Sequence, residues 1–150
     1  MANMTKPLVL SIKSFEVVDL IDSCDFLNIG KSSASRSDMT MFAVAMGLNE
    51  GTKAPIVGNK YFDRFEYLKG QNFSQLIAVL IKDNKDLDID IENCCNDNEV
   101  MDLASAFANT GLDEIRKLYE GCNMSTENAT LALAERLDKK YEELFGKAII

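Results

Sequence analysis

The sequence predicts a mainly α-helical fold with a small β component (α+β), a compact helical domain with a short two- or three-stranded sheet. Apolar residues recur at helical spacing in several segments that are separated by Gly, Asn and Ser. Residues 86–92 instead alternate acidic and aliphatic side chains, and a period of two is the side-chain period of a β-strand. At 150 residues and 47% hydrophobic, the chain is expected to form one globular domain over residues 1–150.

The N-terminal part is expected to contain a short strand or helix start, followed by a helix. Leu8–Ile12 is an apolar run that is either a first strand or the beginning of the helix that follows. That helix is predicted to end near residues 27–30, where Asn and Gly suit a C-terminal cap. Its apolar positions recur at roughly helical spacing: Phe15, Val18, Leu20, Ile21 and Cys24.

A second helix is predicted with clear signals at both ends. Its body is Met39–Met46, with Ser37 or Asp38 as the N-terminal cap and Gly47 as the stop. The segment MTMFAVAM is apolar almost all round, which is typical of a helix buried on most sides. We therefore expect this helix at the centre of the core.

The middle of the chain is predicted to alternate between extended and helical segments. Tyr61–Leu68 is moderately β-prone through its aromatic residues, and Phe73–Ile81 has the apolar spacing of a helix. Asn98–Ala108 and Leu112–Tyr119 also have helical spacing, and the tripeptide 109–111, Asn-Thr-Gly, is expected to break them apart. Two helices joined in this way form an αα-hairpin or a helix-turn-helix.

The last predicted helix begins after a cap at Ser125 or Thr126 and runs to about Phe145. Its remaining faces carry mixed charges, and its apolar face consists of Ala134, Leu137, Tyr141, Leu144 and Phe145. No apolar run approaches the 18 or so residues of a membrane span, and no secretory signal is visible at the N-terminus. The sequence therefore predicts a cytoplasmic protein with reduced thiols and no membrane contact.

Negative charge is concentrated in one stretch. Residues 1–81, 82–102 and 103–150 carry net charges of 0, −6 and −2, which together give −8. In a strand over residues 86–92 the aliphatic side chains face the core and the carboxylates form an acidic comb facing solvent. The candidate partner-binding residues are the acids of this comb and two that follow it: Asp86, Asp88, Asp90, Glu92, Asp97 and Glu99.

An acidic surface of this kind predicts a basic partner. Proteins hold bare nucleic acid largely by neutralising phosphates with Lys and Arg, so direct nucleic-acid binding is not expected. In a helix-turn-helix the second helix, Leu112–Tyr119, would enter the DNA groove. Asp113 and Glu114 at its start would repel the DNA. The expected partner is a basic protein surface, such as that of a nucleic-acid-binding protein. The alternative is that the comb is a solvated sheet edge whose like charges prevent aggregation.

No motif identifies a reaction, and the chain is expected not to be an enzyme. It contains no histidine, which excludes the Ser-His-Asp and Cys-His nucleophilic systems and most catalytic zinc sites. No glycine-rich phosphate-binding loop is present. A carboxylate-dependent enzyme stays an alternative, but the sequence contains 24 Asp and Glu residues, and no two of them stand out as a catalytic acid and base. No catalytic residue and no cofactor is therefore expected.

The sequence partly matches the patterns of two metal sites, and neither site is expected. Asp86, Asp88 and Asp90 match the first three ligand spacings of a calcium-binding EF-hand loop. The sixth position is Ile91 where Gly is needed, and the twelfth is Asp97 rather than Glu. A zinc site would need four cysteines that show no CxxC spacing, two of them adjacent: Cys24, Cys94, Cys95 and Cys122.

Three segments together resemble a known family. They are SRSDMTMFAVAMGLNEGTKAPI (Ser35–Ile56), DRFEYLKGQNFSQLIAVLI (Asp63–Ile81) and VMDLASAFANTGLDEIRKLY (Val100–Tyr119). In order and spacing they resemble small accessory proteins encoded beside bacterial Dnd-type DNA phosphorothioation operons. The resemblance implies an accessory or regulator in a prokaryotic DNA-modification or phage-defence setting, and it brings no catalytic residues with it.

The expected function is therefore protein binding without catalysis. The alternative is an anti-defence inhibitor from a phage or mobile element, acting on a CRISPR or restriction nuclease through an acidic, DNA-mimicking surface. The partner's identity and the oligomeric state are left open by the sequence.

Overall fold

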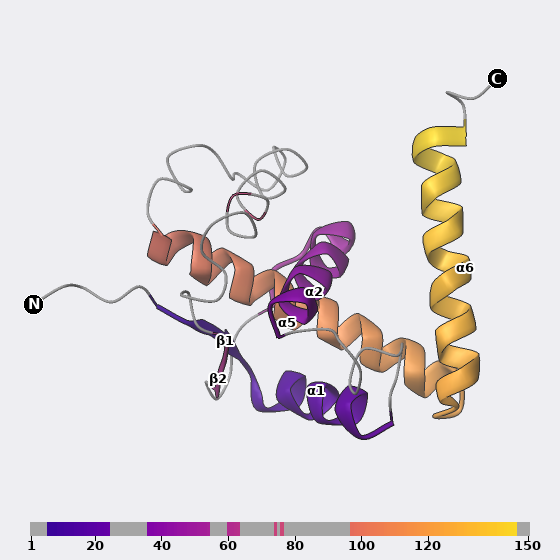
Figure 1. The fold of residues 1–150 in the computed structure, drawn as a ribbon, viewed down its shortest axis with the longest axis horizontal. Coiled ribbons are helices and arrows are strands. Elements are labelled where there is room, and N and C mark those ends of the chain that lie inside the picture. The colour runs from indigo at the N-terminus through magenta and orange to yellow at the C-terminus, as the bar shows by residue number, and fades with distance from the viewer. Residues whose placement is uncertain are drawn as a thin grey trace, which may run out of the picture.

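A computed structural model of the chain describes residues 6–24, 36–54, 60–63, 74, 76 and 97–146 (Figure 1). Within these ranges the chain forms four helices and one two-stranded sheet, which confirms the predicted mainly α fold with a small β component. In chain order the elements are β1 (Leu8–Leu10), α1 (Ile12–Cys24), α2 (Arg36–Glu50), β2 (Lys60–Asp63), α5 (Asp97–Gly121) and α6 (Thr126–Phe145).

The sheet pairs β1 and β2 in antiparallel register. Val9 lies opposite Tyr61, Leu10 lies opposite Lys60, and the register shifts between Leu8 and Val9. The apolar run that was expected to be a strand or a helix start contains both, because β1 ends at Leu10 and α1 begins at Ile12. The strand predicted over Tyr61–Leu68 is confirmed at its beginning, and its later residues lie outside the described ranges.

Helix α1 begins directly after the first strand. The Oγ atom of Ser11 accepts a hydrogen bond from the backbone N–H of Ser14 at 3.1 Å, which satisfies one of the free donors of the first turn. The apolar positions Val17, Val18 and Ile21 are buried, so the predicted helix is confirmed as far as Cys24. Its predicted end near residues 27–30 lies outside the described ranges.

Helix α2 is longer than predicted at both ends. It runs from Arg36 to Glu50, so Ser37 and Asp38 lie within its first turn and Gly47 lies inside it. The predicted stop at Gly47 is therefore wrong. The residue that follows the helix is Gly51, whose φ of +73° is a left-handed conformation that favours glycine, and whose N–H donates to the carbonyl of Gly47 at 3.1 Å.

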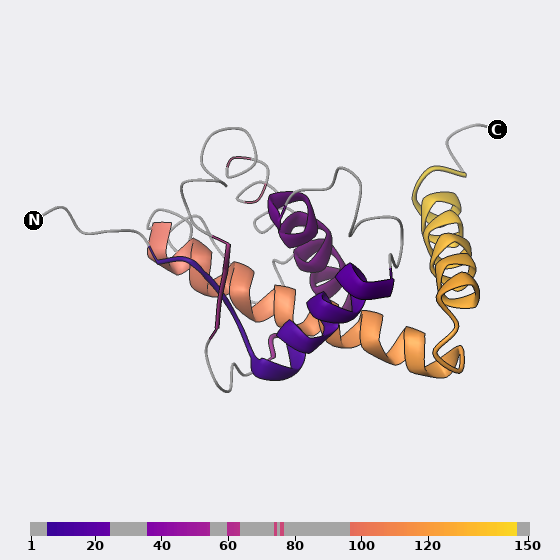
Figure 2. The same cartoon turned by 60° about the horizontal axis from the view of Figure 1, so that its bottom comes forward.

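Gly47 has a different role, at the crossing of α2 and α5, which Figure 2 shows from a second direction. A Cβ atom at Gly47 would lie closer than 3.0 Å to the carbonyl oxygen of Phe107, and one at Gly111 would lie equally close to the carbonyl oxygen of Ala43. The two glycines therefore allow the two helix backbones to touch. This contact is the most extensive one between the described elements.

The expected break between two helices is absent, because α5 is one continuous helix from Asp97 to Gly121. The hairpin and helix-turn-helix interpretations are wrong. Each residue of the supposed break makes a tertiary contact that outweighs its low helix propensity. The Asn109 amide binds the backbone of β1, the Thr110 hydroxyl donates to the carbonyl of Thr52 at 2.9 Å, and Gly111 lies at the crossing.

Polar side chains of α5 also form hydrogen bonds with the backbone groups of β1 and of the residue that follows it. Ser105 Oγ accepts from the Val9 N–H at 3.0 Å, and Asn109 both donates to the Val9 carbonyl at 3.1 Å and accepts from the Ser11 N–H at 2.8 Å. A helix face thus takes the place of a further strand, and the strand backbone is not left without partners. The i, i+4 spacing of Ser105 and Asn109 is the sequence signal for this face.

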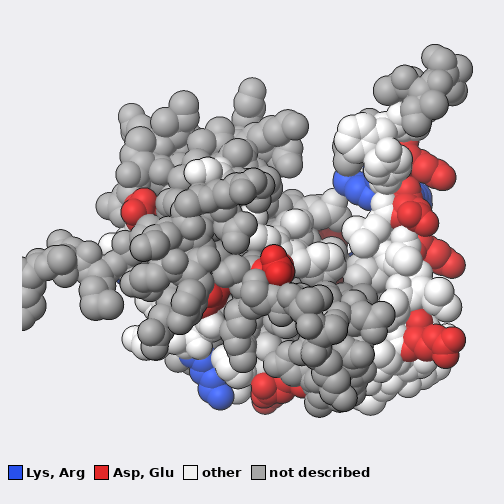
Figure 3. Space-filling model, viewed as in Figure 1, with Lys and Arg blue, Asp and Glu red and all other residues white. Residues whose placement is uncertain are grey.

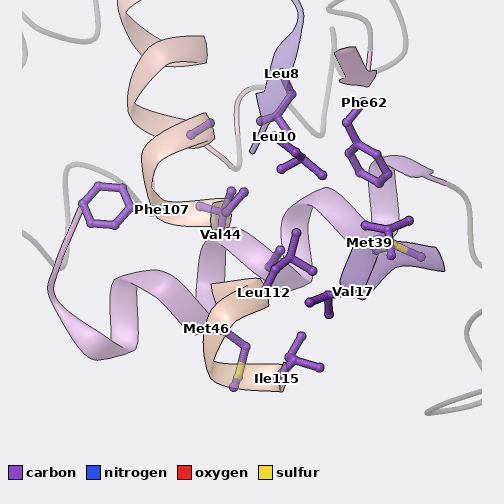
Figure 4. Packing of buried hydrophobic residues seen from close by; sticks show 14 of the residues in the cluster. Leu8, Leu10, Val17, Met39, Val44, Met46, Phe62, Phe107, Leu112 and Ile115 are labelled. Atoms are coloured by element: carbon purple, nitrogen blue, oxygen red, sulfur yellow. The ribbon is translucent and has the colours of Figure 1, made fainter. Parts of the chain in front are cut away.

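The core lies between α2, α5, α1 and the sheet (Figure 4). The placement of α2 in the core is as predicted, since Met39, Ala43, Val44 and Met46 are buried. Leu76 is fully buried as well, although the rest of the helix predicted over Phe73–Ile81 is outside the described ranges. The labelled core side chains come from five elements: Leu8, Leu10, Val17, Met39, Val44, Met46, Phe62, Phe107, Leu112 and Ile115.

Helix α6 is confirmed with the predicted cap, since the N–H of Asn128 donates to Ser125 Oγ at 3.2 Å. A tight turn precedes it, in which Asn123 and Met124 both have positive φ. Near its start α6 packs on α5 through the buried Ala129 and Leu133, and beyond that it stands away from the other described elements (Figures 1 and 2). Among the described helices, none is both long enough and apolar enough for a membrane span.

Candidate functional site

Two of the six predicted partner-binding residues fall on described parts of the chain. Asp97 and Glu99 are exposed in the first turn of α5. Carboxylates there are also stabilised by the positive end of the helix dipole, so they have a structural reason for their position. The other four, Asp86, Asp88, Asp90 and Glu92, lie outside the described ranges, and so does the strand predicted to carry them.

The N-terminal segment binds this acidic end of α5. The backbone N–H of Lys6 donates to Asn98 Oδ1 at 2.7 Å. The ammonium group of the Lys6 side chain lies 3.1 Å from a carboxylate oxygen of Asp102. Both charged side chains are mostly exposed, so this ion pair contributes little stability. It does neutralise part of the negative charge beside Asp97 and Glu99.

A polar cavity of about 260 Å³ lies where the first turn of α1, the segment after α2 and the middle of α5 meet. Its lining includes Ser11, Ser14, Asn109 and Lys117. These groups already have partners within the fold: Ser11 donates to Ser14, Asn109 binds β1, and Lys117 pairs with neighbouring carboxylates of α5. The cavity is therefore a hydrogen-bonded polar junction between elements, and no lining group shows the arrangement of an activated nucleophile.

The charges beside this cavity form a network along α5. Arg116 contacts Asp113 at 2.5 Å and Glu120 at 3.3 Å, while Lys117 lies 3.2 Å from both Asp113 and Glu114. Partial burial by itself raises the pKa of Asp113, but hydrogen bonds from Arg116 and Lys117 hold this pKa below its ordinary value. A carboxyl group with a lowered pKa stays ionised at neutral pH, which does not suit a general acid.

Helix α6 carries four of the large apolar side chains that are exposed on the described surface. We call Leu131, Ala134, Leu137, Tyr141 and Phe145 the α6 stripe. They are spaced by three or four residues, which places them on one face of the helix. Leu131, Leu137, Tyr141 and Phe145 are 58%, 47%, 60% and 50% exposed. The rings of Tyr141 and Phe145 contact each other, with centroids 5.0 Å apart.

Charged residues border the α6 stripe differently on its two sides. Glu135, Asp138 and Glu142 follow one side, and we call them the acidic edge. Lys140 lies beyond the other side of the stripe, and Arg136 lies on the far face of the helix. All five are exposed, and Figure 3 shows acidic side chains gathered along one side of α6 with basic ones mainly on the other. An apolar stripe bordered by charged residues has the make-up of a protein interface.

In the described part of the chain, no group of three or more His, Cys, Asp or Glu side chains is close enough together to hold a metal ion. Cys122, in the turn before α6, is a half-buried free thiol. Comparisons with protein-family models, curated proteins and solved structures give no match for this chain. The candidate site therefore rests on the geometry of α6.

Proposed function

We propose that this protein works by binding another protein through the α6 stripe, without catalysis. The observation that carries the proposal is the exposure of four large apolar side chains on one face of a helix that stands away from the core. Isolated exposed apolar residues are common, but a contiguous row bordered by charges is typical of an interaction site. Tyr141 and Phe145 are of the residue types that are enriched at the centres of interfaces.

The proposed setting is a prokaryotic DNA-modification or phage-defence system in the cytoplasm, in which the protein is an accessory or regulator. This setting is supported by the resemblance of three segments to proteins encoded beside Dnd-type operons. In such a system the partner is expected to be a protein that handles nucleic acid, and such a protein would offer the basic surface that an acidic chain favours.

A second candidate function is inhibition of a nuclease through a DNA-mimicking acidic surface. It is favoured by the position of Asp97, Glu99 and Asp102, which are all exposed at one end of the long helix α5. Carboxylates held on a rigid helix can occupy the place of phosphates in a basic groove. Binding of this kind would weaken as salt screens the charges, whereas binding through the α6 stripe would change little with salt.

The test is affinity capture from lysate of the source cells, followed by reconstitution of the captured protein with purified chain. Three forms are compared: the native protein, Leu137→Gln with Tyr141→Glu, and Asp97→Asn with Glu99→Gln. Loss of the purified complex in the first variant alone supports the α6 stripe, and loss in the second alone supports the acidic surface. If both variants bind the partner as tightly as the native protein, the proposal is wrong.

A carboxylate-dependent enzyme is the third class, and stoichiometry separates it from the other two. A binding protein acts at near-equimolar dose, while an enzyme acts on an excess of substrate. The reconstituted complex should therefore show an effect that saturates at about one chain per partner.

A further inference from the structure

We propose that the chain forms a domain-swapped dimer, in which two copies exchange α6. In each copy the turn at residues 122–125 would become helical, so that α5 and α6 join into one helix from Asp97 to Phe145. The start of each α6 would then pack on the α5 of the other copy, as it packs on its own α5 in the monomer. This inference goes beyond the proposed function, because the exchanged contact is the buried side of α6 and not the α6 stripe.

The turn between α5 and α6 is strained. Asn123 and Met124 have φ angles of +54° and +60°, a left-handed conformation in which Asn is common and Met is rare. Two hydrogen bonds close the turn: the N–H of Met124 donates to the Tyr119 carbonyl at 3.0 Å, and the N–H of Asn123 donates to the Glu120 carbonyl at 3.1 Å. A helix through these residues removes the strain at Met124, and short hinges under strain favour domain swapping.

The contact that would be exchanged is small. Ala129 and Leu133 of α6 are buried in the same cluster as Ile115 and Tyr119 of α5. From residue 134 to residue 145, every side chain that the structure describes is exposed. Among the described elements, only the first part of α6 therefore has to leave α5, and a second copy restores the same contact.

The buried positions before and after the turn would share one face of a continuous helix. Alternating steps of three and four residues place side chains on one face. Such steps connect six positions through the turn without interruption: Ile115, Tyr119, Cys122, Thr126, Ala129 and Leu133. Four of them are buried, and the two nearest the turn are half-buried. The monomer does not require this continuity, because its turn already separates the two helices.

The same six positions are symmetric about residue 124, which indicates a second copy as the partner. In two antiparallel helices that cross at residue 124, Ile115 of one copy faces Leu133 of the other, and Tyr119 faces Ala129. A two-fold axis at the crossing forms both sets of contacts at once, as an isologous dimer requires.

The length of the pattern indicates a weak dimer. The next positions after Leu133 in the pattern are Arg136 and Lys140, which are charged and exposed. The paired region therefore ends near Leu133 and is smaller than a standard protein interface. We expect a dissociation constant on the order of 1 mM for the native chain.

The first test changes residue 123, where alanine and glycine act in opposite directions. Alanine is unfavourable in the left-handed turn and favourable in a helix, so Asn123→Ala should strengthen dimerisation about 100-fold, counting both chains. Glycine is favourable in the turn and unfavourable in a helix, so Asn123→Gly should weaken dimerisation about tenfold. Asn128→Ala is the matched control, because it makes the same replacement at an exposed position that is helical in both states.

The measurement is sedimentation velocity of the full chain from about 10 to about 500 µM, a range that brackets the dissociation constant expected for Asn123→Ala. Asn123→Ala should change from monomer to dimer, while Asn123→Gly stays monomeric and Asn128→Ala behaves like the native chain. Circular dichroism establishes that each variant is folded.

The second test distinguishes exchange of α6 from a dimer of closed chains. Spin labels are introduced with an unnatural amino acid at residues 99 and 142, and the labelled chain is diluted with unlabelled chain, so that only distances within one chain are measured. In the exchanged dimer of Asn123→Ala the two labels are separated by one continuous helix of about 65 Å at 1.5 Å per residue. In monomeric Asn123→Gly the turn brings them closer together, and electron–electron double resonance measures the difference.

The outcomes separate this inference from the proposed function. If Asn123→Ala stays monomeric up to about 500 µM, the inference is overturned. It is equally overturned if all the variants dimerise alike, or if the label distance in the dimer equals that in the monomer. Asn123→Gly keeps the α6 stripe and should bind a reconstituted partner as the native chain does. If no dimer forms but Leu137→Gln with Tyr141→Glu abolishes that binding, the proposed function stands and only the exchange is rejected.

Discussion

Replacing Gly47 with alanine is expected to destabilise the fold, although alanine is the better helix former. The new Cβ would lie closer than 3.0 Å to the carbonyl oxygen of Phe107. That oxygen belongs to the backbone of α5 and cannot rotate away, so the two helices would have to separate. Alanine gains about 1 kcal/mol over glycine inside a helix, whereas overpacking an interior costs about 1–3 kcal/mol and more where backbones must move. We expect a net loss of about 2 kcal/mol.

The assay is urea denaturation followed by far-ultraviolet circular dichroism, with Gly121→Ala as the control. Gly121 ends α5, has no neighbour within 4 Å of its would-be Cβ, and should tolerate alanine or gain slightly. Gly111→Ala should behave like Gly47→Ala. The double variant should lose less than the sum, because helices already separated accommodate a second methyl group more easily. A Gly47→Ala protein as stable as Gly121→Ala would refute the close crossing of α2 and α5.

Three further predictions concern the contacts that hold the elements in place. Asn109→Ala removes the amide that binds the β1 backbone and should cost about 2–4 kcal/mol, with faster amide exchange at Ser11 as the local signature. Ser125→Ala removes the cap of α6 and should lower stability by about 1 kcal/mol, visible as a loss of helical signal, while unchanged helicity would argue against the cap. Asp113 has a pKa below its ordinary value of 3.8, so its ion pairs stabilise the fold above that pH and lose their effect as pH falls through the lowered value. Asp113→Asn should therefore lower the urea midpoint slightly at neutral pH, and the difference from the native protein should vanish in strong acid.

The sequence predicted the class of fold and most of the described elements, because apolar spacing reports the buried face of a helix directly. It failed where a residue of low helix propensity is used for a tertiary contact. Gly47 and the tripeptide 109–111 resemble helix stops, and both lie inside helices where α2, α5 and β1 meet. Local propensity cannot reveal this, since the contact partner of Gly47 is 60 residues away along the chain, at Phe107.

The candidate site was predicted less completely. The acidic comb over residues 86–92 stays a prediction, and of the predicted partner-binding residues only Asp97 and Glu99 could be placed, at an exposed helix start. The sequence correctly predicted that apolar residues share one side of the last helix. Amphipathic spacing does not say whether that side packs on the core or stays exposed. Its exposure depends on the turn at Asn123 and Met124, which directs α6 away from the core.

That exposure separates the role of the α6 stripe from the stability of the fold. Leu137, Tyr141 and Phe145 lie beyond the buried Ala129 and Leu133, which already hold the start of α6 on α5. A polar residue at any of the three would leave the monomer's core unchanged and would cost little helix propensity. If these side chains served only the monomer, nothing in its described packing would require them to be apolar. Large apolar residues that contribute nothing to the core, and that recur on one face over two turns of helix, are instead what a binding surface requires.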